Sequence, residues 1–352
     1  MLESSTSSPA TGSASIPGLF ATAAAAVGVV EHRITVAGLP MRLRYAGEAM
    51  RHRLDPPFAH LTRTGSEPVS GHELTVDIWD AASTGTDHPP SLGEPVEGGG
   101  PGTIHYYEQG PVRALARWET LSVLDSQAAH AWFWTADPAD MLSWDWASPL
   151  RNILHWWLGS HGSLQVHGGA VGEPHGGVLV VGRGGSGKST TTLASLFSGL
   201  RYAGDDFVGV SVEPEPWVHS LYCSGKLENY HIGRFPRLAG AIVNPERTED
   251  EKVVVTAGAA APGVPIEGFP LRAVLIPRVV AVEPETRLVP ASRAAALAAL
   301  APSTIFQLHP PHPDALRSMG ELVRRVPCYT LELGRDIDAI PDAIRVFLEG
   351  GE

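Results

Sequence analysis

Residues 178–196 read VLVVGRGGSGKSTTTLASL, and this stretch decides the fold. An apolar run with strand character leads into Gly182, four further residues, and then Gly187, Lys188 and Ser189. This spacing matches the phosphate-loop pattern in its strand, loop and helix context. A glycine-rich turn without a ligand would need neither the lysine nor the serine, so we interpret the segment as a phosphate loop.

The residue types of this loop suggest separate roles. The glycines allow turns that a Cβ would block, so that successive N–H groups face a polyphosphate, and the following helix adds its positive end. Lys188 is expected to reach the β and γ phosphates of ATP, and the Ser189 hydroxyl to ligate Mg²⁺. The expected nucleotide-binding residues are Gly182, Gly184, Gly185, Ser186, Gly187, Lys188, Ser189 and Thr190.

Two adjacent carboxylates, Asp205 and Asp206, follow Lys188 by 17 residues and interrupt an apolar segment. In a regular strand they would point to opposite faces, so only a strand end or a bulge lets both approach one ligand. One acid would bind Mg²⁺ and the other would accept a proton from a substrate hydroxyl. We place Ser189 and Asp206 on the metal, while the choice of base stays open. The alternative is a turn with two solvated acids.

The order of these motifs, with His167-Gly168 on the strand before the phosphate-loop strand, resembles the HPr kinase/phosphorylase family. The resemblance is close over residues 160–212 and loose from there to residue 352. It implies an α/β P-loop kinase domain of the HPr kinase/PEP carboxykinase type, which uses a nucleotide to phosphorylate a Ser hydroxyl. It also implies catalytic roles for His167, Lys188, Asp205 and Asp206. From its residue type alone, His167 is equally a structural histidine.

Four later segments look like HPr-kinase-related serine kinases found beside peptide-modification genes, among them the lasso-peptide kinases. This resemblance implies a peptide or small protein carrying a Ser as the partner, with a ribosomal peptide precursor as one candidate. The long glycine-containing segment that follows the Asp pair in the bifunctional family is not recognisable, which argues against phosphorylase activity and against HPr as the substrate. The segments are residues 216–230, 251–255, 270–279 and 300–308.

The chain contains 23 Arg but only three Lys, at positions 188, 226 and 252. Lys226 or Lys252 could supply a second cation for a transferring phosphoryl group; a surface lysine and a strand-edge charge are equally good explanations. Arg278 is a candidate phosphate or purine contact, or else a salt-bridged arginine. Ser303 and Thr304 are interpreted as a helix cap first and a nucleotide contact second.

The composition excludes several classes of protein. A formal charge of −12 argues against a generic nucleic-acid binder and against an anionic-membrane binder. The apolar run at residues 19–30 is too short to span a bilayer, and no signal peptide is expected. Two cysteines, Cys223 and Cys328, indicate a reduced, cytoplasmic protein in which both are small buried hydrophobes. The sequence leaves open whether the chain forms a homo-oligomer.

Composition and periodicity predict a flexible tail or a loosely docked segment at residues 1–30, a smaller β-rich domain at 31–148 that is a candidate for substrate recognition, and the catalytic domain at 149–352. A helix at 149–158 would connect the two domains. The other expected helices cover 188–197, 292–300, 313–326 and 337–348. The expected strands cover 34–37, 41–45, 74–79, 103–107, 114–118, 129–134, 164–167, 177–181, one strand within 202–210, 217–221, 253–256, 273–277 and 329–333.

Together these features predict a Mg-ATP-dependent kinase that transfers a phosphoryl group to a Ser hydroxyl of a peptide or small protein. A kinase for a free small-molecule hydroxyl would use the same residues. A nucleotide-binding regulator that only senses ATP is the alternative from another class of protein.

Overall fold

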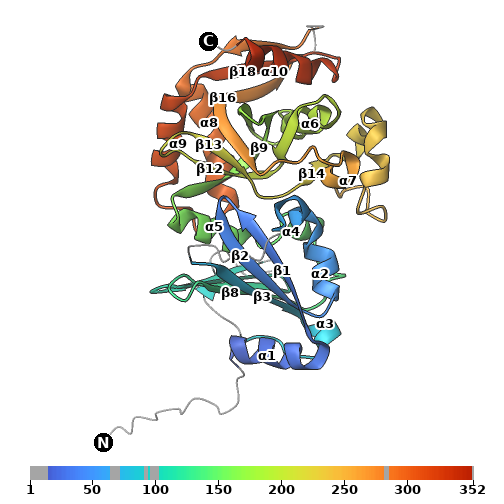
Figure 1. Cartoon of the computed structure of the whole chain (residues 1–352), viewed down its shortest axis with the longest axis vertical. Helices are drawn as coiled ribbons and strands as arrows, with labels where there is room; N and C mark the ends of the chain where they lie inside the picture. Colours follow the sequence, from blue (N-terminus) through green and yellow to red (C-terminus); the bar gives the residue numbers. More distant parts are fainter. Residues whose placement is uncertain (1–14, 64–71, 91–93, 96–102, 281–284, 351–352) are drawn as a thin grey trace, which may run out of the picture. The chain divides into compact units, whose positions relative to one another are not determined.

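The computed structural model describes residues 15–63, 72–90, 94–95, 103–280 and 285–350. The chain divides into two compact units (Figure 1). The first comprises Met1–Glu31, Leu43–Arg51 and Thr75–Asp140. The second comprises His32–Arg42, His52–Leu74 and Met141–Glu352, so it takes in three stretches that the sequence assigned to the β-rich domain, the third being residues 141–148. No helix in the described part of the chain is long and apolar enough to cross a membrane.

The N-terminal sheet has eight strands in the order β1-β2-β3-β8-β7-β6-β5-β4. Its pairs are antiparallel from β4 through β8, whereas β3 pairs with β8 in parallel. The expected strands of this region are confirmed, and β4 and β7 were not predicted. The strands are β1 (Val29–Val36), β2 (Leu39–Ala46), β3 (Leu74–Asp80), β4 (Glu94–Pro95), β5 (Ile104–Gln109), β6 (Val112–Arg117), β7 (Thr120–Asp125) and β8 (His130–Thr135).

Part of the segment expected as a flexible tail is a helix. Residues 1–14 lie outside the described residues, but α1 (Ile16–Val27) begins at the Ser15 cap, whose hydroxyl accepts from the Gly18 N–H. Leu19 and Phe20 are buried on this helix in a cluster that includes Trp79. The prediction of a tail is therefore wrong for α1, because a run of alanines carries enough apolar surface on one face to cover a sheet.

The second unit is a mixed α/β structure whose sheet contains parallel strands. Strands β10, β9, β12, β13 and β16 pair in that order, and β16 also pairs with β10, so the pairings form a closed ring. Strand β16 runs parallel to both β10 and β18. The strands are β9 (Ser163–Glu173), β10 (Gly176–Val181), β11 (Arg201–Gly204), β12 (Phe207–Ser211), β13 (Trp217–Ser220), β16 (Gly268–Val279), β17 (Arg287–Pro290), β18 (Cys328–Leu333) and the separate pair β14 (Ser224–Leu227) and β15 (Val253–Thr256).

The helices predicted for this unit are confirmed, with shifted ends. The expected helix 188–197 is α6 followed by a 3-10 turn, η2 (Ser195–Phe197). The remaining 3-10 helices are η1 (Pro56–Leu61), η3 (Asn229–Arg234) and η4 (Pro236–Ala241). The α-helices after α1 are α2 (Ala49–Leu54), α3 (Ala81–Thr84), α4 (Ser143–Trp146), α5 (Arg151–Ser160), α6 (Lys188–Ala194), α7 (Ala257–Ala260), α8 (Arg293–Gln307), α9 (Ala315–Arg325) and α10 (Ala339–Glu349).

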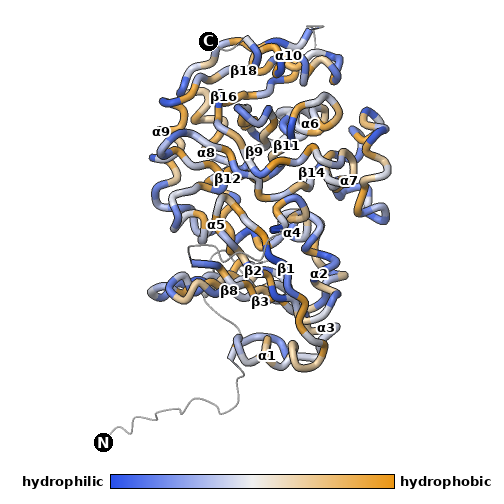
Figure 2. The backbone as a smooth tube through the Cα atoms, viewed as in Figure 1, coloured by the Kyte–Doolittle hydropathy of each residue, from blue (hydrophilic) through white to orange (hydrophobic). Residues whose placement is uncertain are grey.

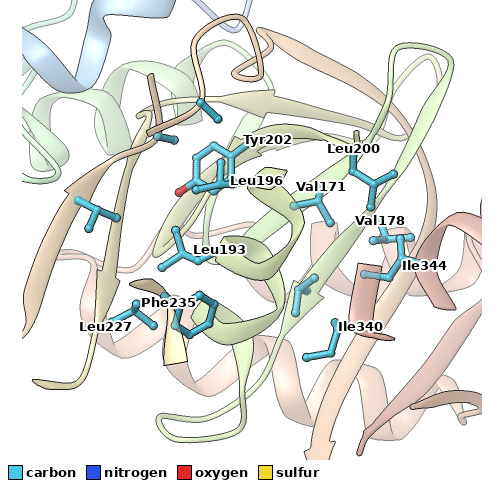
Figure 3. Close-up of a cluster of buried hydrophobic side chains, with 14 of the residues drawn as sticks. Val171, Val178, Leu193, Leu196, Leu200, Tyr202, Leu227, Phe235, Ile340 and Ile344 are labelled. Atoms are coloured by element: carbon cyan, nitrogen blue, oxygen red, sulfur yellow. The ribbon is translucent and has the colours of Figure 1, made fainter. Parts of the chain in front are cut away.

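Two apolar cores flank the strands of the second unit. One joins alternate residues of β9 and β10 to α6 and α10, with Leu193 and Ile344 among its fully buried members (Figure 3). The other joins the opposite residues of the same strands to α8 and α9, with Leu300 and Met319 fully buried. Hydrophobic and hydrophilic stretches alternate along these helices (Figure 2), as expected for elements with one buried face. Cys223 and Cys328 are both buried free thiols, as predicted.

Candidate active site

The glycine-rich loop connects β10 to α6 and depends on glycine at two positions. Gly182 has φ +152°, and a Cβ there would lie 2.7 Å from Ser186 Oγ. Gly187 has φ +107°, and a Cβ there would overlap Leu333 Cδ1. Gly185 also has a positive φ, whereas Gly184 does not and has open space around it. The expectation that every loop glycine is needed for its backbone turn is therefore wrong for Gly184.

Lys188 begins α6 and folds back over the loop. Its Nζ donates to the Gly182 carbonyl at 2.8 Å and to the Arg183 carbonyl at 3.3 Å, and the residue is 8% exposed. Burial lowers the pKa of Lys188, although the charges of Asp205 and Asp206 oppose this effect. The Ser186 Oγ is buried in the same loop with no hydrogen-bond partner among the described residues. The loop thus holds one ammonium and one unused hydroxyl close to its backbone.

The two acids lie at a break between strands, as the sequence predicted. Strand β11 ends at Gly204 and β12 begins at Phe207. Asp206 has φ +68°, a left-handed conformation that few residues other than glycine adopt. Its carbonyl accepts from the Gly168 N–H at 3.0 Å, which ties the break to β9. Because of this break, the two adjacent carboxylates reach different partners within one site.

Asp205 is directed toward α6. Its Oδ1 accepts from the Thr192 hydroxyl at 3.2 Å, and its Oδ2 accepts from the Lys226 backbone N–H at 3.1 Å. The side chain is nearly inaccessible, and burial together with the charge of Asp206 raises the pKa of Asp205. The Ser189 hydroxyl lies close enough to lower that pKa in part. Ser189 therefore neighbours Asp205, whereas the sequence interpretation paired Ser189 with Asp206 on the metal.

Asp206 is directed toward His167 and Lys226. Its Oδ1 lies 3.1 Å from His167 Nε2, and its Oδ2 accepts from Lys226 Nζ at 2.6 Å. The side chain is 23% exposed. Burial alone would raise the pKa of Asp206, but Lys226 and His167 outweigh it and hold this pKa well below its usual value. Asp206 is thus an ionised carboxylate between two nitrogen donors.

His167 is fixed by its surroundings. Its backbone N–H donates to Thr304 Oγ1 of α8 at 3.2 Å, and its ring lies 5.3 Å from the ring of Phe207. The residue is 8% exposed, and its Nδ1 has no partner in the described part of the chain. Ser303 and Thr304 lie inside α8, which continues through Pro302, so the prediction of a helix cap at these two residues is wrong.

The remaining candidate cations lie in two different places. Lys252 pairs with Glu228 at 2.9 Å and is 52% exposed. Burial would lower the pKa of Lys252, but the hydrogen bond and charge of Glu228, together with the charges of Asp206 and Asp205, raise it overall. Arg278 is 63% exposed and forms an ion pair with Glu332. Arg278 therefore forms the salt bridge of the second alternative, and a contact to a phosphate or purine stays a prediction.

Sequence reasoning missed two residues of the site, Thr192 and Gly169. Thr192 lies one turn after Lys188 on α6 and is fully buried beside Asp205. A Cβ at Gly169 would overlap Thr192 Cγ2 and lie 3.0 Å from the Gly204 carbonyl oxygen. The glycines after His167 were a usable signal, because glycine inside a strand often marks a close approach of another backbone. Nothing in the sequence singled out Thr192.

Comparisons with known proteins find similarity among solved structures. No family model and no curated protein matches the chain. The solved structure of the HPr(Ser) kinase/phosphatase from Coxiella burnetii is similar over 51% of this chain and 93% of its own, with 13% sequence identity and a TM-score of 0.27. A similarity of this extent does not by itself establish a family or an activity.

Proposed function

We propose that this protein is a Mg-ATP-dependent kinase that transfers the γ-phosphoryl group to a Ser hydroxyl of a peptide or small protein. The observation that carries the proposal is the convergence of Lys188, Asp205, Asp206 and His167 on the loop that follows β10. Positioning and electrostatic stabilisation dominate phosphoryl transfer, so one ammonium, two carboxylates and a glycine-rich loop supply the required groups.

The two acids receive different roles in this proposal. Asp206 is partly exposed and is the base: its carboxylate takes the proton of the acceptor hydroxyl, whose oxygen forms a bond to the γ-phosphorus. The bond from that phosphorus to the β-phosphate oxygen breaks, and ADP leaves with the electron pair. His167, held by Thr304, orients the Asp206 carboxylate through Oδ1. Lys188 binds the β and γ phosphates.

In this proposal a magnesium ion would lie beside Asp205, the acid that neighbours Ser189. The Ser189 hydroxyl and the Asp205 carboxylate are hard oxygen donors of the type Mg²⁺ prefers, and they lie close together. We therefore assign Ser189 and Asp205 to the metal, in place of Ser189 and Asp206. When bound, Mg²⁺ would neutralise charge that develops on the β and γ phosphates. Thr192 orients Asp205 for this role.

Two acceptor pools separate the proposal from a small-molecule kinase. The protein is incubated with ATP labelled on the γ-phosphate, once with the peptides encoded beside its gene and once with a pool of metabolites that carry hydroxyl groups. The proposal predicts label on a Ser of a peptide, located by mass spectrometry. Label only in the metabolite pool would show that the protein phosphorylates a small molecule that carries a hydroxyl group. Tight ATP binding with label in neither pool would support a nucleotide-sensing regulator.

A further inference from the structure

Lys226 contacts both acids of the site through different atoms. Its backbone N–H donates to Asp205 Oδ2, and its ammonium binds Asp206 Oδ2 at 2.6 Å. The backbone of Lys226 is held in β14, where it pairs with Val254 of β15. The main chain is thus fixed at Asp205, while the four-carbon side chain is the part of Lys226 that can turn.

The Lys226 ammonium is bound to one of the two carboxylate oxygens of Asp206, the residue proposed as the base. Both oxygens of Asp206 have partners, His167 at Oδ1 and Lys226 at Oδ2. His167 is held by the contacts of its backbone and its ring, so its imidazole has little freedom to leave. Lys226 Nζ is therefore the partner of Asp206 that can move to another anion.

A bound polyphosphate would attract the Lys226 ammonium away from Asp206. Lys226 is 10% exposed on its side chain, so an ammonium at this position is strongly attracted to any anion that enters the site. A γ-phosphoryl group brings such an anion, with acceptor oxygens that suit a compact ammonium. Lys188 Nζ donates to the loop carbonyls, whereas Lys226 Nζ is bound to Asp206, so Lys226 is a second cation beside the loop-proximal Lys188 that a phosphoryl group could attract.

We propose that Lys226 is a cation that exchanges partners, bound to Asp206 when no γ-phosphate is present and to the γ-phosphoryl group when ATP is bound. This inference rests on the proposed function and deepens it. In the resting state the ion pair holds the Lys226 ammonium at Asp206, and nucleotide binding draws it to the transferring group, which leaves the Asp206 carboxylate to the acceptor hydroxyl. Lys226 then stabilises the charge that grows during transfer, in addition to the ion at Ser189 and Asp205.

The experiment compares the affinities of a non-hydrolysable imido analogue of ATP and of ADP, measured by calorimetry with Mg²⁺. It needs no acceptor and no turnover. The quantity compared is the dissociation constant of ADP divided by that of the ATP analogue. If Lys226 contacts the γ-phosphoryl group, Lys226→Met weakens the binding of the analogue more than that of ADP and lowers this ratio by about tenfold or more. Lys226→Arg keeps the charge and retains part of the ratio. An unchanged ratio in Lys226→Met would overturn the partner exchange.

Further variants protect the result from effects on folding. Lys226→Met leaves the charge of Asp206 with one partner fewer. The double variant Lys226→Met/Asp206→Asn removes both charges and is measured beside it. We expect the double variant to show the same lowered ratio. Arg44→Met breaks a comparable pair in the first unit, where Arg44 Nη1 lies 2.8 Å from the buried Asp77, and should keep the wild-type ratio. An equal loss in Arg44→Met would contradict a role specific to Lys226. Wild-type protein that binds neither nucleotide would instead overturn the proposed function itself.

Discussion

Asp205 and Asp206 are neighbours in the chain, yet their carboxylates have no partner atom in common among the described side chains. The left-handed φ of Asp206 turns its carboxylate to His167 and the Lys226 ammonium, whereas Asp205 accepts from Thr192 and the Lys226 backbone. Two adjacent acids that repel each other therefore have separate compensating groups. This separation is the basis for giving them different roles.

The glycine-rich loop gives a stability prediction with a control in the same loop. Gly187→Ala places a Cβ against Leu333 at a positive φ, and we expect it to lower the free energy of unfolding by about 2 kcal/mol or more. Gly184→Ala meets open space and should change that free energy by no more than about 0.5 kcal/mol. Urea denaturation of both variants measures the difference. Equal stability of the two variants would disagree with the loop geometry.

Adjacent threonines on α6 test the metal assignment. Thr192→Val removes the hydroxyl that donates to Asp205, and we expect the affinity for Mg²⁺ in the presence of ATP to fall about 10–100-fold. Thr191→Val removes a hydroxyl that donates to the Gly187 carbonyl and should retain the affinity of the wild type. Calorimetric titration with Mg²⁺ measures both. If both variants lose affinity alike, Thr192 has no special relation to the metal.

Stability should depend on pH through His60. Burial lowers the pKa of His60 to about 4, from an ordinary value of about 6.5 in the unfolded chain. Between these values the unfolded chain binds the proton and the folded chain does not, so stability falls as the pH drops from 6.5 toward 4. One such group contributes a slope of at most about 1.4 kcal/mol per pH unit. His219, whose pKa is also lowered to about 4, adds to this dependence.

The variant His60→Gln isolates this contribution. Its free energy of unfolding, measured by denaturant titration at pH 7, 6 and 5, should depend less on pH than that of the wild type. His175→Gln is the control, because His175 is 72% exposed on its side chain. A wild-type pH dependence in His60→Gln would show that His60 takes up its proton equally in both states.

Much of the second unit could be predicted from sequence because its strands are apolar runs and its glycine-rich loop has a fixed spacing. The strand break at Asp205 and Asp206 was also predictable, since two adjacent acids in a regular strand cannot face one ligand. Strand β14 was missed because it is four residues long and pairs with β15, where Lys226 lies opposite Val254, 28 positions later in the chain. Local pattern carries no information about such a pairing.

The partners of the acids could not be predicted for the same reason. Thr192 and Lys226 reach Asp205 and Asp206 from elements that come together only in the folded chain. The presence of only three lysines drew attention to these residues, and two of them, Lys188 and Lys226, lie beside the Asp pair. The assignment of Asp206 to the metal had no such guide, because spacing alone does not tell which acid faces Ser189.

The most direct test of the central claim is the transfer of label from γ-labelled ATP to a peptide Ser by the wild type and by the variants Lys188→Ala and Asp206→Asn. We predict transfer by the wild type and a loss of at least about 100-fold in each variant, while circular dichroism shows that both variants are folded. Transfer at nearly the wild-type rate by both folded variants would contradict the account.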